Sequence, residues 1–258
     1  MHRISVASDA PALVLAVAGA GVGASRELAE QIGQEAAISC PGVDIRLGYL
    51  SGDIQHLVSA LSGGPANGKG PAPHAVVVPL LAGPHPVIDA AIAAVISQAT
   101  APIMLADHLG PHPLLAGALH DRLAESGLAR ASRARGLNIA AGANGILVVA
   151  DRGPEAISDA GLTAVLLAAR IAVPVVPAAL GDSDSIHAAL DRLREAGASH
   201  LAIAPCVIGP ETRPGEFDQL SAAIGAPCAA PLGAHPAIAQ LVAIRYGEAL
   251  ARISVASH

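Results

Sequence analysis

Residues 75–86, AVVVPLLAGPHP, and residues 201–212, LAIAPCVIGPET, follow one pattern, and this pair decides the fold. In each stretch an apolar run passes a proline, Pro79 or Pro205, and reaches a Gly-Pro turn. The residue after that turn is His85 in the first stretch and Glu211 in the second. The offset between the two prolines, 205 − 79 = 126, is close to half of the 258 residues. The sequence therefore predicts an internal duplication.

A second pair of stretches supports the duplication. Residues 107–119, DHLGPHPLLAGAL, correspond to residues 230–242, APLGAHPAIAQLV, and align His112 with His235. The offset is 235 − 112 = 123 residues, nearly the same as for the first pair. Two similar α/β lobes, 1–130 and 131–258, are expected to enclose one cleft faced by corresponding strand ends, where function should reside.

Strand and helix patterns alternate along both halves. Apolar runs bounded by glycine or proline predict strands, and apolar residues at helical spacing predict the helix that follows each of them. The expected strands are 12–18, 43–49, 74–81, 101–106, 146–150, 173–179, 199–207 and 226–230; the expected helices are 25–38, 53–62, 86–98, 113–126, 158–171, 184–197, 214–224 and 236–252. Such alternation predicts an α/β fold, with a doubly wound parallel sheet in each lobe and helices on both faces.

Composition narrows the function. The net charge is −6, Lys69 is the only lysine and there is no tryptophan, so neither a phosphate backbone nor stacked bases have an obvious binding surface. Cys40, Cys206 and Cys228 are scattered and odd in number, which indicates free thiols and a cytoplasmic protein. No apolar run reaches the roughly 20 residues of a membrane span. A small-molecule partner is expected, with neither nucleic acid nor membrane, for a monomer or homodimer.

The most conspicuous local motif is GAGVGA at residues 19–24, directly after a predicted strand. It fits the glycine fingerprint of dinucleotide-binding proteins, in which a pyrophosphate lies at the helix N-terminus. The acid that binds the ribose belongs at the end of the second strand, where this chain has Tyr49, Leu50 and Ser51. An NAD(P)-dependent enzyme therefore remains an alternative with an incomplete motif.

Two motifs point to another family. VVVPLLAGPHPVID at 76–89 carries His85 and, four residues later, Asp89, and LGPHPLL at 109–115 contains His112. The chain resembles the CbiX/SirB group of sirohydrochlorin chelatases, the class II chelatases, in their long two-lobed form with an internal duplication. This resemblance covers most of the chain.

The resemblance implies insertion of divalent cobalt, iron or nickel into a sirohydrochlorin-like tetrapyrrole, in cobalamin or siroheme biosynthesis. The metal ion is then a substrate, and no organic cofactor is expected. Such a reaction requires a ligand for the ion and a base for the two pyrrolic protons, and imidazole can serve as both. His85 is the expected principal metal-handling residue, and Glu211 from the other lobe is its expected partner in catalysis and metal binding.

One position departs from the family pattern. Aligning LAVAGAG with LVVADRG at 147–153 places Ala20 opposite Arg152, and Ala20 also stands where the family carries its first metal-handling histidine. A tetrapyrrole- or metal-binding protein derived from a chelatase, without turnover, is therefore a second alternative. The expected substrate-binding residues are Gly19, Ala20, Gly21, Asp89, His112, Arg152 and Arg213.

Purely structural roles can also explain several of these residues. His112 and His235 both stand between a strand and a helix, before a proline, where a side chain can cap the helix. Asp89 can orient His85 or cap its own helix. Arg152 and Arg213 match carboxylates on a substrate, but surface or lobe-bridging charges are an equally simple role. Cys206 is expected to be a small buried apolar residue.

Overall fold

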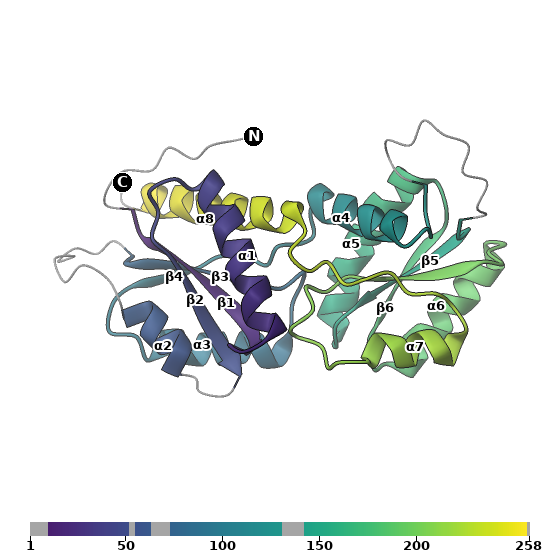
Figure 1. Ribbon diagram of the computed structural model, residues 1–258, viewed down its shortest axis with the longest axis horizontal. Helices are drawn as coiled ribbons and strands as arrows, with labels where there is room; N and C mark the ends of the chain where they lie inside the picture. The colour runs from purple at the N-terminus through teal and green to yellow at the C-terminus, as the bar shows by residue number, and fades with distance from the viewer. Residues whose placement is uncertain (1–9, 52–54, 63–72, 131–141, 257–258) are drawn as a thin grey trace. The chain divides into compact units, whose positions relative to one another are not determined.

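A computed structural model describes residues 10–51, 55–62, 73–130 and 142–256. Within these ranges the strands are β1 Ala12–Ala20, β2 Ile45–Ser51, β3 Ala75–Pro79, β4 Ile103–Leu105, β5 Gly145–Ala150, β6 Val175–Ala179 and β7 Leu201–Pro205. The helices are α1 Ala24–Ser39, α2 Gln55–Ser62, α3 Pro86–Ser97, α4 Pro113–Glu125, α5 Pro154–Ile171, α6 Ser183–Glu195, α7 Glu216–Ile224 and α8 Pro236–Ala256. The predicted α/β class with two parallel sheets is confirmed (Figure 1).

The chain divides into two compact units that are not continuous in sequence. The first comprises Met1–Leu81, Pro86–Leu109 and Ala234–His258; the second comprises Ala82–His85 and Gly110–Gly233. Helix α4 therefore belongs to the second unit and α8 to the first, whereas the predicted lobes 1–130 and 131–258 assign these helices the other way round. The short segment that carries His85 also belongs to the second unit.

The sheet of the first unit has the order β2-β1-β3-β4, and all its pairs are parallel. Every residue of β3 is buried, as expected for a strand covered on both faces. Helices α2 and α3 cover one face, where Leu57 and Ile92 pack against alternate residues of β1 and β3. Helix α8 contacts α1 and β3, and Tyr246 of α8 donates a hydrogen bond of 2.6 Å to the carbonyl of Pro11. The C-terminal helix thus completes the first unit.

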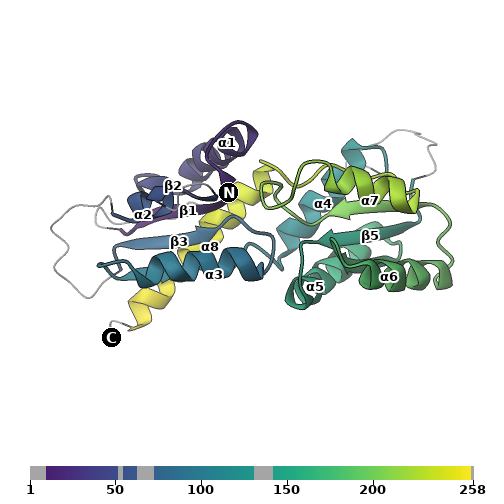
Figure 2. The same ribbon diagram turned by 90° about the horizontal axis from the view of Figure 1, so that it is seen from below.

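The sheet of the second unit has the order β6-β5-β7, again parallel. On one face, α6 and α7 pack against β5 and β7 through a cluster that includes Leu190 and Phe217, and Figure 2 shows these two helices from below. Helices α4 and α5 contact each other, and they contact β7 and β6 respectively. Both sheets are therefore layered between helices, which leaves the carboxyl ends of their strands as the natural place for chemistry.

One predicted strand is wrong. Residues 226–230 form only an isolated bridge, Ile203 to Cys228, with hydrogen bonds from Ile203 N to the Pro227 carbonyl and from Ala229 N to the Ile203 carbonyl. Pro227 lies within this segment and Pro231 follows it, and neither has an N–H to donate, so a regular ladder does not form. The second sheet accordingly has three strands in the described part of the chain, where four were expected.

Candidate functional site

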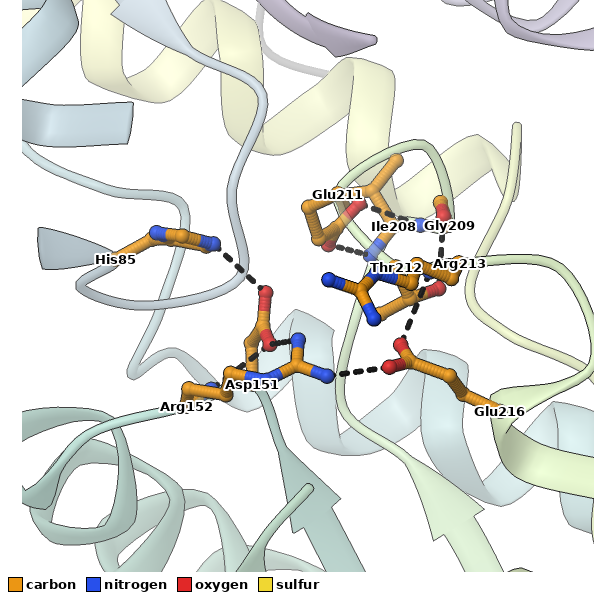
Figure 3. A network of polar contacts seen from close by, with 9 residues as sticks. All are labelled: His85, Asp151, Arg152, Ile208, Gly209, Glu211, Thr212, Arg213 and Glu216. Carbon is orange, nitrogen blue, oxygen red and sulfur yellow. Dashed lines mark hydrogen bonds and ion pairs between the residues drawn. The ribbon is translucent and has the colours of Figure 1, made fainter. Parts of the chain in front are cut away.

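His85 follows β3 within the Gly-Pro turn and reaches a carboxylate of the second unit. Its Nε2 lies 3.1 Å from Oδ2 of Asp151, the residue directly after β5 (Figure 3). The side chains of His85 and Asp151 are only 12% and 7% exposed. The imidazole expected to handle the metal is therefore enclosed beside a buried acid.

Asp151 is the start of a chain of charges. Its Oδ1 accepts hydrogen bonds from the backbone N–H of Arg152 at 2.8 Å and from the Arg152 guanidinium at 3.3 Å. The same guanidinium is paired with Glu216 at the start of α7, and the other oxygen of Glu216 accepts from Arg213 N at 3.0 Å. Burial acts to raise the pKa of Glu216, but the Arg213 N–H and the Arg152 guanidinium outweigh it and lower that pKa.

These contacts decide the roles of the two arginines. The guanidinium of Arg152 is shared between Asp151 and Glu216, so it bridges acids within the second unit. Arg213 orders the same cluster through its backbone N–H. Arg152 therefore joins two acids within one unit and does not bridge the two predicted lobes. Contact of either arginine with substrate stays a prediction.

Glu211 is engaged by its own loop. Its carboxylate accepts hydrogen bonds from the N–H of Ile208 at 2.5 Å and of Gly209 at 2.7 Å. Part of the residue reaches the surface, yet burial of the carboxylate raises its pKa to about 7 against those hydrogen bonds, and the charge of Asp151 adds to the rise. The carboxylate that the structure places in contact with His85 is that of Asp151, whereas Glu211 accepts hydrogen bonds from its own loop, and the expected His85–Glu211 pair stays a prediction.

Asp89 and His112 have local partners. Asp89 lies on α3 and its Oδ1 is 2.9 Å from Nε2 of His108, so this acid orients His108, and orientation of His85 by Asp89 stays a prediction. His112 is the N-cap of α4, and its Nδ1 accepts from Leu114 N at 3.1 Å. His235 does the same for α8, accepting from Ala237 N at 3.2 Å. The capping interpretation of both repeated histidines is confirmed.

The glycine-rich turn after β1 is packed by an aromatic ring. A Cβ on Gly21 would lie 2.7 Å from the Tyr49 ring, and Tyr49 is 7% exposed. Tyr49 lies near the end of β2, where a dinucleotide-binding protein has its ribose-binding acid. The arrangement gives the NAD(P) alternative no support. Substrate binding by Gly19, Ala20 and Gly21 stays a prediction.

Asp151 is the residue that the sequence argument missed. The alignment of LAVAGAG with LVVADRG places it opposite Gly19, one position before Arg152. A carboxylate present at a strand end in only one copy of a repeat was the available signal.

Cys206 is buried, and burial raises its pKa to about 12, in agreement with the expected apolar role. Among the described residues, no group of three or more His, Cys, Asp or Glu side chains is arranged to hold a metal.

Comparisons with known proteins bear on the fold. No protein-family model matches the chain, and no curated protein matches its sequence. None of the helices in the part of the chain that the structure describes is long and apolar enough to cross a membrane.

Two solved structures match nearly the whole chain. The sirohydrochlorin chelatase SirB from Bacillus subtilis subspecies spizizenii, in complex with cobalt, is 20% identical, with a TM-score of 0.62, over 93% of this chain and 94% of that chain. SirB from Bacillus subtilis with Fe3+ is 19% identical, with a TM-score of 0.64, over 94% and 96% of the two chains. The protein therefore has the two-lobed fold of the sirohydrochlorin chelatases.

Proposed function

We propose that this protein inserts a divalent metal ion, Co2+, Fe2+ or Ni2+, into a sirohydrochlorin-like tetrapyrrole, in cobalamin or siroheme biosynthesis. Support comes from the fold, which is that of SirB along 93% of the chain, and from the strand-end motifs that resemble the same family. The observation that carries the proposal is the enclosed position of the His85 side chain. Its imidazole follows β3, is 12% exposed and lies against an acid.

The chemistry requires that one divalent ion enters the macrocycle as two pyrrolic protons leave. The neutral imidazole of His85 can bind cobalt, nickel or ferrous iron through a ring nitrogen. Once the ion passes to the pyrrole nitrogens, the same lone pair is released and can accept one of the departing protons. The second proton passes to solvent or to a second base.

A tetrapyrrole- or metal-binding protein without turnover is the second candidate. The observation that favours it is the identity of residue 20, an alanine at the end of β1 where the resembled family has a histidine. In this reading the protein keeps the binding of a macrocycle or ion but lacks one of the groups that moves protons.

The experiment is anaerobic incubation of the protein with sirohydrochlorin and Co2+, Fe2+ or Ni2+ in turn, following the absorption spectrum of the tetrapyrrole. Insertion faster than in a protein-free control with at least one metal is the expected result. Binding of the tetrapyrrole, seen as a spectral shift, with metallation at the control rate would favour the carrier. Neither binding nor insertion would reject both.

A further inference from the structure

The pairing of His85 with Asp151 differs from an ordinary hydrogen bond between a histidine and an acid. Oδ2 of Asp151 is buried and accepts no hydrogen bond from the described residues, although Nε2 of His85 is 3.1 Å away. Another His–Asp pair, His108 and Asp89, makes a hydrogen bond of 2.9 Å and is more exposed, at 25% and 33%. Asp151 therefore keeps one buried carboxylate oxygen at ion-pair distance from the His85 imidazole, without a hydrogen bond from the described residues.

The two oxygens of Asp151 have separate tasks. Oδ1 is anchored by the backbone N–H and guanidinium of Arg152, and that guanidinium is itself anchored by Glu216. These contacts fix the rotation of the carboxyl group and leave Oδ2 directed at His85 (Figure 3). Supporting groups of this kind are what orient metal ligands in proteins.

The distance between the two atoms matches one edge of a metal coordination sphere. Donors that lie about 2.0 to 2.2 Å from a divalent ion, at a right angle to each other, are about 3.0 Å apart. The observed separation of Nε2 and Oδ2 is 3.1 Å. One imidazole nitrogen and one carboxylate oxygen are donors that cobalt, nickel and ferrous iron all accept.

We propose that His85 Nε2 and Asp151 Oδ2 together bind the divalent metal substrate, with Asp151 as its second protein ligand. This inference rests on the proposed function, because it identifies how the ion is held before insertion. Two protein donors occupy one edge of the coordination sphere, and the remaining positions can be filled by water and then by pyrrole nitrogens. The carboxylate also offsets the positive charge of the ion, which a lone imidazole does not do.

The first test is calorimetric titration of the full chain with Co2+ alone, with the visible absorption of the bound ion as a second readout. Asp151→Asn keeps the size of the side chain and an oxygen for Arg152, but it replaces the free carboxylate oxygen by an amide. We expect the Co2+ dissociation constant to rise at least tenfold and the absorption bands of the bound ion to change. Asp191→Asn removes the same charge from an exposed residue of α6, 68% exposed beside Arg194, and should bind Co2+ as the wild type does.

The double variant His85→Ala with Asp151→Asn adds a further criterion. Two ligands of one ion lose their effect together, so the double variant should be little weaker than His85→Ala. Unchanged Co2+ affinity in Asp151→Asn, with the wild type still inserting metal, would overturn the inference and leave the proposed function standing. Weakened binding in Asp151→Asn, with a wild type that inserts no metal, would leave the ligand pair standing and reject the chelatase reaction.

A measurement on the unaltered protein covers the case in which Asp151→Asn does not fold. Crystals of the wild type soaked with CoCl2 should show anomalous density within about 2.2 Å of both Nε2 and Oδ2. An ion on His85 that does not touch Asp151, or an ion bound only elsewhere, would contradict the proposal.

Discussion

The ends of strands β1 and β5 occupy the same position in the two copies of the repeat but carry different chemistry. β1 ends with Gly19 and Ala20, whereas β5 ends at Ala150 and is followed by Asp151 and Arg152. Each strand end is followed within a few residues by a helix, α1 from Ala24 and α5 from Pro154. The two copies thus share the order of strand and helix, but they differ in that the second strand end carries an ion-pair network.

The two strand ends differ in which of them carries charged side chains. The strand end that holds charged groups is also the one that His85 contacts, through Asp151. The corresponding turn in the other copy is small and apolar, with the Tyr49 ring packed against Gly21. Charged side chains therefore gather at one of the two corresponding strand ends.

The largest effect is expected for His85→Ala. Removing the proposed ligand and base should reduce metal insertion at least 100-fold, within the range that a positioned acid or base contributes. The rate is measured from the tetrapyrrole spectrum, and folding from thermal unfolding. Because His85 is largely buried against Asp151, its removal should also lower the melting temperature by several degrees, and the rate is therefore measured at a temperature where both proteins are folded.

The matched control is His187→Ala, which removes an exposed histidine whose Nδ1 contacts the Ser183 carbonyl within α6. It should insert metal at the wild-type rate. Equal rates in His85→Ala and the wild type would remove His85 from the centre of the reaction.

Ala20→His makes the first turn resemble the family motif and is expected to have the next largest effect. If the protein is an enzyme weakened by the loss of an imidazole, metal insertion should rise roughly tenfold or more, because a second base is restored. The readout is the same spectral assay, with Ala20→Leu as a control for side-chain size. No gain with histidine would favour the carrier.

The strands and helices could be predicted from sequence because buried parallel strands and amphipathic helices leave strong periodic signals. β1, α3 and α4 were expected at 12–18, 86–98 and 113–126, and they occur at Ala12–Ala20, Pro86–Ser97 and Pro113–Glu125. The exchange of α4 and α8 between units could not be predicted. Periodicity shows that a helix has an apolar face but not which sheet that face covers.

Part of the candidate site could be predicted from sequence motifs. His85 was found from its motif, and the caps made by His112 and His235 follow from their place before a helix. Which carboxylate meets His85 depends on loop conformation. Glu211 carries the right group at the repeated position, but its carboxylate accepts hydrogen bonds from the adjacent N–H groups of Ile208 and Gly209.

Glu211 predicts a pH dependence of stability. Burial raises its pKa in the folded state to about 7 from an ordinary value of 4.5, so the folded state binds the proton more tightly than the unfolded chain. The stabilisation from this group is therefore complete below about pH 4.5 and is lost as the pH rises through 7. The loss should be on the order of 1 to 3 kcal/mol in the free energy of unfolding.

Urea unfolding at several pH values between 4 and 8 measures this loss. Glu211→Gln cannot titrate, so the difference in stability between the wild type and this variant should change across that range. Glu195→Gln, at an exposed position of α6, should follow the wild-type curve in parallel. Parallel curves for Glu211→Gln as well would show that the carboxyl group does not retain its proton on folding.

The smallest effects are expected at the two repeated histidines, where the copies agree. His112→Ala and His235→Ala each remove a ring nitrogen that accepts a backbone N–H at the start of α4 or α8, so each should cost about 1 kcal/mol of stability. His112→Asn and His235→Asn supply another cap and should recover most of it. Because the two caps are alike, a difference in tetrapyrrole affinity between the two variants would come from a contact with the tetrapyrrole. A weaker tetrapyrrole dissociation constant in His112→Asn but not in His235→Asn would assign His112 a binding role beyond its cap, and equal constants would limit both residues to helix capping.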